Sequence, residues 1–341
     1  MSDVRSYLQF LFAGLMVLCL AGCSGRCSQH ADKQQGVPVI FDTDMGGDVD
    51  DAGALAMLQA MADMGQAKIL AAMSANRNPL SAAAIDVINT YYGRGDLPIG
   101  SSKTGPNLEK TNYDNADEFL HDLQSGDEAP DAVDLYRRIL AGQPDNSVVI
   151  VVVGWLTNMA DLLDSKPDQY SPLNGRELVK AKVRELVSMG GIWPNTKHFN
   201  IRYREYNFRM DAAAAHKVIS DWPGKIMFTA LGKDVMTGGR LVAEAPADNP
   251  VPHFYRKFFK KYKITERTSC DQVAVLYAVR GLSDYFTSVN RGRCIGKADG
   301  TNEWIPGPAS SHSYLVYKMP PNQLAAIIED LMLMPPARGY R

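Results

Sequence analysis

Five carboxylates lie within ten residues, from Asp42 to Asp51, directly after a short apolar run. Their mutual repulsion needs a counter-charge, which the N-terminus of a following helix supplies in part and a divalent cation supplies far more completely. Ligands that are all oxygen atoms suit Ca²⁺ or Mg²⁺ rather than zinc. Gly46 and Gly47 allow the tight backbone bend that lets the side chains converge. The sequence therefore predicts a hard-cation site in this loop.

Other kinds of structure also contain closely spaced aspartates, but each requires a different sequence pattern. An acidic N-cap on a surface helix explains one or two aspartates, but not five after a buried strand. An EF-hand loop does not fit because, counted from Asp42, its fifth and twelfth positions are Gly46 and Gly53 rather than acids. A haloacid-dehalogenase-type phosphatase stays open as an alternative, with Asp42 as nucleophile and Asp44 as acid. The later lysine of that pattern has one remote counterpart, Lys233.

The elements that must position the acidic loop alternate along the chain. Strands are predicted over 37–41, 68–73, 147–153, 183–189 and 225–229, and helices over 52–64, 79–92, 132–141, 156–164, 209–219, 272–279 and 323–334. This alternation predicts a single α/β domain, over 37–341, with a mainly parallel open sheet covered by helices on both faces. Ligands of such sheets bind outside the carboxyl ends of the strands. The acidic loop follows the first strand directly and so lies at that edge.

Composition limits the partners of the chain. Its 341 residues include 45% hydrophobic and 22% charged residues, enough for a large core. The formal net charge of −2 provides no basic field, so we expect no nucleic-acid partner.

The N-terminal segment resembles a bacterial lipoprotein signal. Residues 7–20 are nearly all apolar, follow Arg5 and precede Leu20-Ala21-Gly22-Cys23. The run is too short for a spanning helix. We expect a signal peptide over 1–23, acylation of Cys23 and a flexible tether over 24–36. The domain would then be lipid-anchored in the bacterial cell envelope, facing the periplasm or the surface, and would touch a membrane only through this anchor. A plain secretory signal cut nearby and a fortuitous apolar start are the alternatives.

The remaining cysteines show no metal-ligand spacing. Beyond the signal and the acylated position they are Cys27, Cys270 and Cys294. In an exported protein Cys270 can pair with Cys294, and both the disulfide and the free thiols stay open at this point.

From Asp42 to Leu58 the chain reads DTDMGGDVDDAGALAML, which resembles the inosine-uridine preferring nucleoside hydrolases. Further segments agree with that family in the same order along the chain. They are Ser74-Ala75-Asn76, the residues 153–158 (VGWLTN), Met189-Gly190-Gly191, the residues 205–211 (EYNFRMD) and the residues 269–272 (SCDQ). The resemblance covers nearly all of residues 37–335.

The resemblance implies a calcium-dependent N-glycosidase of purine or pyrimidine salvage. Such an enzyme hydrolyses ribonucleosides, or a related ribosyl compound, to ribose and free base, and it assembles as a homodimer or homotetramer. By position, Asp44 is the general base. The implied Ca²⁺ ligands are Asp44, Asp51, the Thr157 carbonyl and Asp271. The implied sugar-binding residues are Asp50, Asn76, Met189, Asn200, Glu205 and Asn207.

The chain departs from the family pattern in two ways that affect catalysis. The acidic loop is two residues longer, so Asp48 becomes a further ligand or a second candidate for the base. Cys270 stands where many members have a histidine that protonates the leaving base. Trp193, by stacking on the base, and His198, by donating a proton, are the candidates to compensate. Their ordinary roles would be a core tryptophan and a surface histidine. A relative that binds Ca²⁺ and sugar without catalysis therefore remains a second hypothesis.

Overall fold

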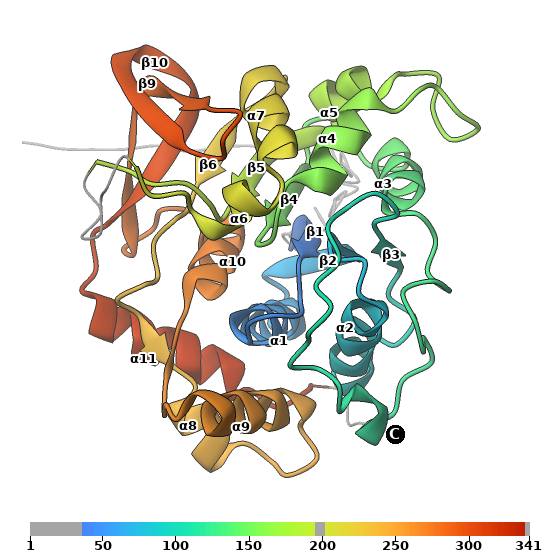
Figure 1. The fold of residues 1–341 in the computed structure, drawn as a ribbon, viewed down its shortest axis with the longest axis vertical. Helices are drawn as coiled ribbons and strands as arrows, with labels where there is room; N and C mark the ends of the chain where they lie inside the picture. Colours follow the sequence, from blue (N-terminus) through green and yellow to red (C-terminus); the bar gives the residue numbers. More distant parts are fainter. Residues whose placement is uncertain (1–35, 195–201, 338–341) are drawn as a thin grey trace, which may run out of the picture. The chain divides into compact units, whose positions relative to one another are not determined.

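The structure is a computed structural model that describes residues 36–194 and 202–337 (Figure 1). The predicted signal peptide, Cys23 and almost the whole tether lie outside the described residues, as do His198 and Asn200. Among the helices of the two described ranges, none is long and apolar enough to cross a membrane.

One eight-stranded sheet runs through the domain in the order β3-β2-β1-β4-β5-β6-β10-β9. All neighbouring strands pair in parallel except β10 and β9, which are antiparallel. The mainly parallel sheet predicted from the sequence is confirmed. The strands are β1 (Val37–Thr43), β2 (Ala67–Ser74), β3 (Ile99–Ser101), β4 (Val148–Val152), β5 (Val183–Ser188), β6 (Ile226–Phe228), β9 (Phe286–Gly296) and β10 (Asn302–Tyr317), with a separate antiparallel pair of β7 (Met236–Thr237) and β8 (Arg267–Thr268).

Helices cover both faces of this sheet, as predicted (Figure 1). Side chains of β1 alternate between two cores. Val39 and Phe41 pack with α1, α10 and α11, whereas Ile40 packs with α3, α4 and α7. The helices are α1 (Asp50–Asp63), α2 (Pro79–Tyr91), α3 (Ala132–Ala141), α4 (Thr157–Asp164), α5 (Gly175–Lys182), α6 (Tyr206–Met210), α7 (Ala212–Asp221), α8 (Gly239–Glu244), α9 (Pro250–Tyr262), α10 (Cys270–Arg280) and α11 (Pro321–Met332).

The strand order reverses between β1 and β4, and this reversal places the acidic loop. On one side of it the chain continues to β2 and β3, and on the other to β5 and β6. Adjacent crossovers that diverge in this way leave a crevice at the carboxyl ends of the strands. Gly154 lies two residues beyond the end of β4. A Cβ added to Gly154 would lie 2.5 Å from the Asp44 backbone nitrogen. A glycine is therefore needed for the two strand ends to approach this closely.

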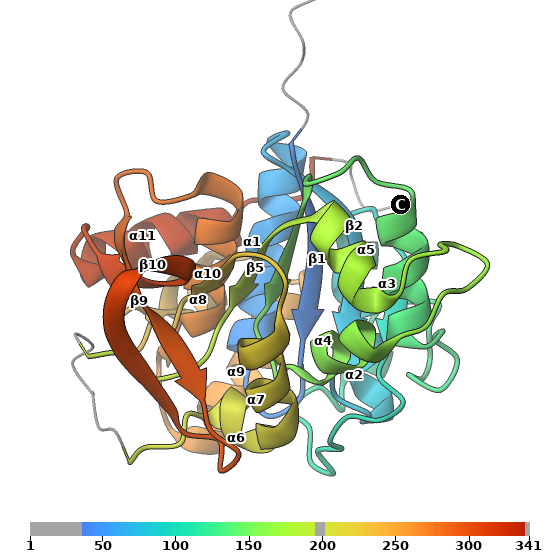
Figure 2. The ribbon, with the colours of Figure 1, turned by 90° about the horizontal axis from the view of Figure 1, so that it is seen from above.

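The fold differs from the sequence prediction in several places, and two of them lie near the site or at the edge of the sheet. The helix predicted over 209–219 is divided at Asp211, whose backbone has φ −136° and ψ 80° and whose side chain caps α7. The antiparallel ribbon β9–β10, at one edge of the sheet in Figure 2, was not predicted. Most of its residues are exposed or half-buried, and β10 contains Pro306 and Gly307, so no regular apolar alternation marks it. Pairing between the strands, rather than a local pattern, forms this ribbon.

Candidate functional site

A cavity of about 750 Å³ opens at the carboxyl ends of the central strands. Its lining residues come from the acidic loop, the end of β4, the segment around α6 and the start of α10. The lining residues are Asp44, Gly47, Asp48, Asp50, Asp51, Val153, Met189, Tyr203, Glu205, Tyr206, Asn207, Lys233, Arg267, Thr268, Cys270 and Asp271. The sequence prediction that the site lies beyond the first strand is thus in agreement with the location of the cavity.

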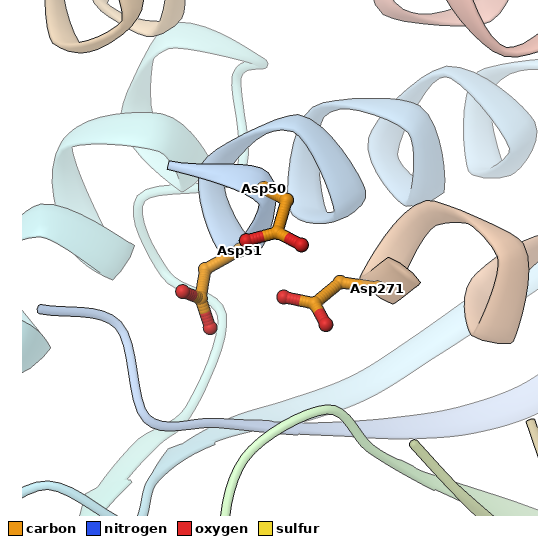
Figure 3. Close-up of side chains that lie close together, drawn as sticks. All are labelled: Asp50, Asp51 and Asp271. Carbon is orange, nitrogen blue, oxygen red and sulfur yellow. The ribbon is translucent and has the colours of Figure 1, made fainter. Parts of the chain in front are cut away.

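Three of the carboxylates that line this cavity lie close together, and Figure 3 shows their side chains. Asp50 and Asp51 are the first residues of α1, and Asp271 lies in the first turn of α10. One carboxylate oxygen from each lies within 4.8 Å of the others, and all three residues are buried. Both helices direct their N-terminal ends toward this point, which contributes partial positive charge. We refer to Asp50, Asp51 and Asp271 as the acidic cluster.

The electrostatics of the acidic cluster fit a bound cation. Burial raises the pKa of all three carboxyl groups, and neighbouring carboxylates raise it further. Ionised together, the three charges are stable only with a strong counter-charge between them. A donor set made entirely of carboxylate oxygens suits a hard divalent ion. Asp44 is not in this cluster but is buried beside it, and its pKa is raised by burial first and then by Asp50.

Asp48 occupies a different environment from Asp44. Its carboxylate accepts hydrogen bonds from Arg267 Nε at 2.9 and 3.0 Å and a further one from Arg267 Nη2. The two side chains are 29% and 35% exposed, so the pair lies at the mouth of the cavity. Asp48 thus turns outward to an arginine, whereas Asp44, next to the acidic cluster, forms no ion pair within residues 36–194 and 202–337.

Asp42 lies on the other face of β1. It is completely buried, and its Oδ2 accepts hydrogen bonds from Tyr136 Oη at 2.8 Å and Asn158 Nδ2 at 3.0 Å. It does not line the cavity. A phosphatase nucleophile must reach its substrate, so this geometry does not favour the aspartate-nucleophile alternative.

We expect the substitution Asp42→Asn to stabilise the protein more at about pH 8 than at about pH 5. Burial raises the folded-state pKa of Asp42 from 3.8 to about 7. Stability linked to this group is therefore complete below about pH 3.8 and is lost as the pH rises toward 7, at about 1.4 kcal/mol per pH unit. Asparagine does not ionise. Thermal denaturation of both proteins checks this, and a difference independent of pH would contradict it.

Four residues predicted for the sugar subsite line the same cavity: Asp50 of the acidic cluster, Met189, Glu205 and Asn207. The buried Glu205 carboxylate accepts hydrogen bonds from the backbone N–H groups of Gly191 at 3.3 Å and Phe208 at 3.1 Å. Burial raises the pKa of Glu205. The side-chain nitrogen of Asn207 donates to the Met189 carbonyl at 3.0 Å. These bonds fix both polar side chains before any ligand binds.

Two other predicted residues do not line the cavity. The Asn76 side chain is fully buried and donates to the Met45 carbonyl at 3.3 Å, while its oxygen accepts from Leu108 N at 3.1 Å. It ties the acidic loop to the chain around Leu108. Thr157 begins α4, and its hydroxyl donates to Asp211 at 2.5 Å. The role of its carbonyl as a metal ligand stays a prediction.

The prediction that Trp193 stacks on a base is wrong for this structure. The side chain is fully buried and stacks on Tyr314, with ring centroids 5.2 Å apart and an interplanar angle of 12°. Phe228 and Trp304 complete this aromatic core. The ordinary role of a core tryptophan applies because the ring packs against β6 and β10. The disulfide considered from the sequence is also absent from the described residues, where Cys270 and Cys294 are free, buried thiols.

Several cavity residues were not predicted for a nucleoside hydrolase. Arg267, Tyr203 and Tyr206 were missed, and Lys233 was considered for the phosphatase alone. Tyr203 and Tyr206 are 45% and 39% exposed, so each offers an aromatic surface at the cavity. Their position on both sides of Glu205 was the signal available in the sequence. Nothing local marks Arg267, because its partner Asp48 is 219 residues away.

Comparison with solved structures shows the same fold. A plant nucleoside hydrolase has a TM-score of 0.64 and 18% identity, covering 88% of this chain and 99% of that one. An inosine-uridine preferring nucleoside hydrolase from Bacillus anthracis has a TM-score of 0.64 and 15% identity, with coverages of 87% and 99%. A purine-preferring ribonucleoside hydrolase from Gardnerella vaginalis has a TM-score of 0.63 and 16% identity, with coverages of 87% and 98%.

Sequence comparison supplies the family. No curated protein matches the chain. The model of the family described as inosine-uridine preferring nucleoside hydrolase matches residues 39–313. That range begins within β1, before the acidic loop, and ends in β10, after Asp271, so it contains every element that forms the cavity floor. The chain therefore belongs to the inosine-uridine preferring nucleoside hydrolases, N-glycosidases that act on nucleosides.

Proposed function

We propose that this enzyme hydrolyses the N-glycosidic bond of ribonucleosides to ribose and free base and that it depends on Ca²⁺. The observation that carries the proposal is the convergence of the buried acidic cluster beside Asp44 at the reversal of strand order. Ca²⁺ is preferred to Mg²⁺ because it accepts irregular oxygen sets, whereas Mg²⁺ demands near-octahedral geometry. When bound, the cation supplies the counter-charge, orients vicinal ribose hydroxyls and acidifies a neighbouring water.

Asp44 is the proposed general base. Its carboxylate lies at the cavity with the acidic cluster, where it can take a proton from a water that attacks C1′ of the ribose. Hydrolysis of a glycosidic bond passes through an oxocarbenium-like state. The carboxylates of Asp44 and Glu205, both buried at this cavity, stabilise the positive charge that develops on the sugar ring. Asn207, held by its backbone bonds, helps to fix the sugar position.

A reducing-sugar assay over a panel of purine and pyrimidine ribonucleosides tests the proposal. We expect ribose release in Ca²⁺, loss of release with a chelator, and recovery when Ca²⁺ is restored. Calorimetric titration of the same preparation with Ca²⁺ distinguishes this enzyme from the second hypothesis, a relative that binds Ca²⁺ and sugar without catalysis. If Ca²⁺ binds and no nucleoside releases ribose, the protein is a non-catalytic relative and the proposed activity is refuted.

A further inference from the structure

A second cavity of about 260 Å³ adjoins the acidic one. The two cavities share four lining residues: Met189, Glu205, Lys233 and Cys270. Away from this junction the smaller cavity is mainly apolar, lined by Gly191, Ile192, Ala230, Leu231, Gly232, Asp234, Leu315, Val316 and Tyr317. A polar sugar suits the acidic compartment, and a flat, weakly polar base suits the apolar one. The bond between sugar and base would then lie at the junction.

Lys233 is held at this junction by the backbone before it. Gly232 has a φ of 108°, and an added Cβ would lie 2.5 Å from the Cys270 Cα, so the chain passes directly against the start of α10. Gly232 N donates to Tyr317 Oη at 2.7 Å, and Ser269 N donates to the Gly232 carbonyl at 3.2 Å. The turn that carries Lys233 is therefore tied to both α10 and β10.

The ammonium group of Lys233 lies beside Tyr203, which lines the larger cavity. Its Nζ lies 4.8 Å from the centroid of the Tyr203 ring, and within residues 36–194 and 202–337 it forms no ion pair. Burial raises the pKa of Glu205, and the positive charge of Lys233 opposes that rise. At the junction Lys233 presents three N–H donors, whereas the Cys270 thiol offers only one weak S–H donor.

We propose that Lys233 is a catalytic residue that contacts the leaving base and donates a proton to it. The proposal rests on the proposed nucleoside hydrolysis. In the balanced step, the oxygen of water bonds to C1′, the C1′–N bond breaks, and its electron pair goes to the base. Asp44 takes one proton from the water, and Lys233 gives one proton to the base. Asp44 then releases its proton to solvent, and Lys233 takes a proton back from solvent. Lys233 thus performs the task for which Cys270 is unsuited.

Substrates with different leaving groups test this role. The variants Lys233→Met and Lys233→Arg are assayed on the nucleoside that the wild type cleaves best and on 4-nitrophenyl riboside, whose phenolate leaves without protonation. We expect Lys233→Met to lower kcat for the nucleoside by about 10²–10⁴-fold. Turnover of 4-nitrophenyl riboside should change little, and Lys233→Arg should recover part of the nucleoside activity because it restores a cationic donor.

Controls separate this inference from the proposed function. Lys217→Met is a matched change on α7, where Lys217 pairs with Asp164 outside the cavities, and it should leave both activities unchanged. Melting temperatures of all variants report on folding. Equal losses on both substrates, or an unchanged nucleoside kcat, would overturn the role of Lys233 while leaving the hydrolase activity intact. A wild-type enzyme inactive on both substrates would instead refute the proposed function, and the Lys233 role with it.

Discussion

Replacing Asp44 with asparagine is expected to lower kcat for nucleosides by about 10²–10⁴-fold, with a much smaller change in KM. Asparagine has nearly the same shape as aspartate but cannot accept the proton of the attacking water. The residue is 8% exposed at the cavity beside the acidic cluster, so no bulk water can readily replace its function. The reducing-sugar assay under saturating Ca²⁺ measures the loss.

Asp48→Asn is the matched control, because the longer loop makes Asp48 the competing candidate for the base. Its carboxylate accepts hydrogen bonds from Arg267, and the two side chains are about one-third exposed. Exposed ion pairs contribute roughly 0–1 kcal/mol, so the substitution should alter stability slightly and kcat far less than Asp44→Asn does. An Asp44→Asn enzyme with full activity, or an Asp48→Asn enzyme with the larger loss, would show that the base is assigned to the wrong aspartate.

Removing one member of the acidic cluster is expected to abolish both activity and the response to Ca²⁺. Asp271→Asn deletes one of three converging carboxylates, and with it the charge needed to hold a divalent ion. In chelator, the variant should melt at or above the wild-type temperature, because burial and the neighbouring carboxylates disfavour an ionised Asp271. With Ca²⁺ the order should reverse. A ligand at 100 times its Kd adds about 2.7 kcal/mol to wild-type stability.

This reversal in the order of the two melting temperatures is measured by thermal denaturation with Ca²⁺ and with chelator. Asp284→Asn provides the control, since Asp284 lies beyond the C-terminal end of α10, is 86% exposed and pairs with Lys318. It should retain the wild-type rise in melting temperature with Ca²⁺. If Asp271→Asn shows that rise as well, the acidic cluster is not the cation site.

The central part of the fold could be predicted because its signals are local. β4 is completely buried, so it appears as an unbroken apolar run, and α1 follows the acidic loop at once. The ribbon β9–β10 could not be predicted in this way, because its strands gain their order from each other and are largely exposed. α9 was also missed, although Pro250 at its start and its capping Asn249 are recognisable helix signals.

The candidate site was likewise predictable only where its signals are local in the sequence. Its acids were found because they are adjacent in sequence, yet which three would converge depends on the packing of α1 against α10. Asp50 is in the cluster, whereas Asp44, predicted as a ligand, lies beside it. The position of Trp193 in the core depends on Tyr314 and Phe228, which follow it in the chain by many residues. Arg267 and Lys233 acquire a role only when later segments fold back onto the loop.

The acidic cluster joins the start of α1 to the last third of the domain, and the Asp48–Arg267 pair joins the loop before α1 to the same part of the chain. Asp48 and Arg267 are 219 residues apart, and the cluster spans a similar distance. Each contact therefore closes a long loop, and the entropy cost of that closure opposes its formation. A fragment that ends before α10 would keep Asp50 and Asp51 but have no third carboxylate. If the proposed function holds, a cation that needs all three carboxylates would bind only after the last third of the chain has packed against α1.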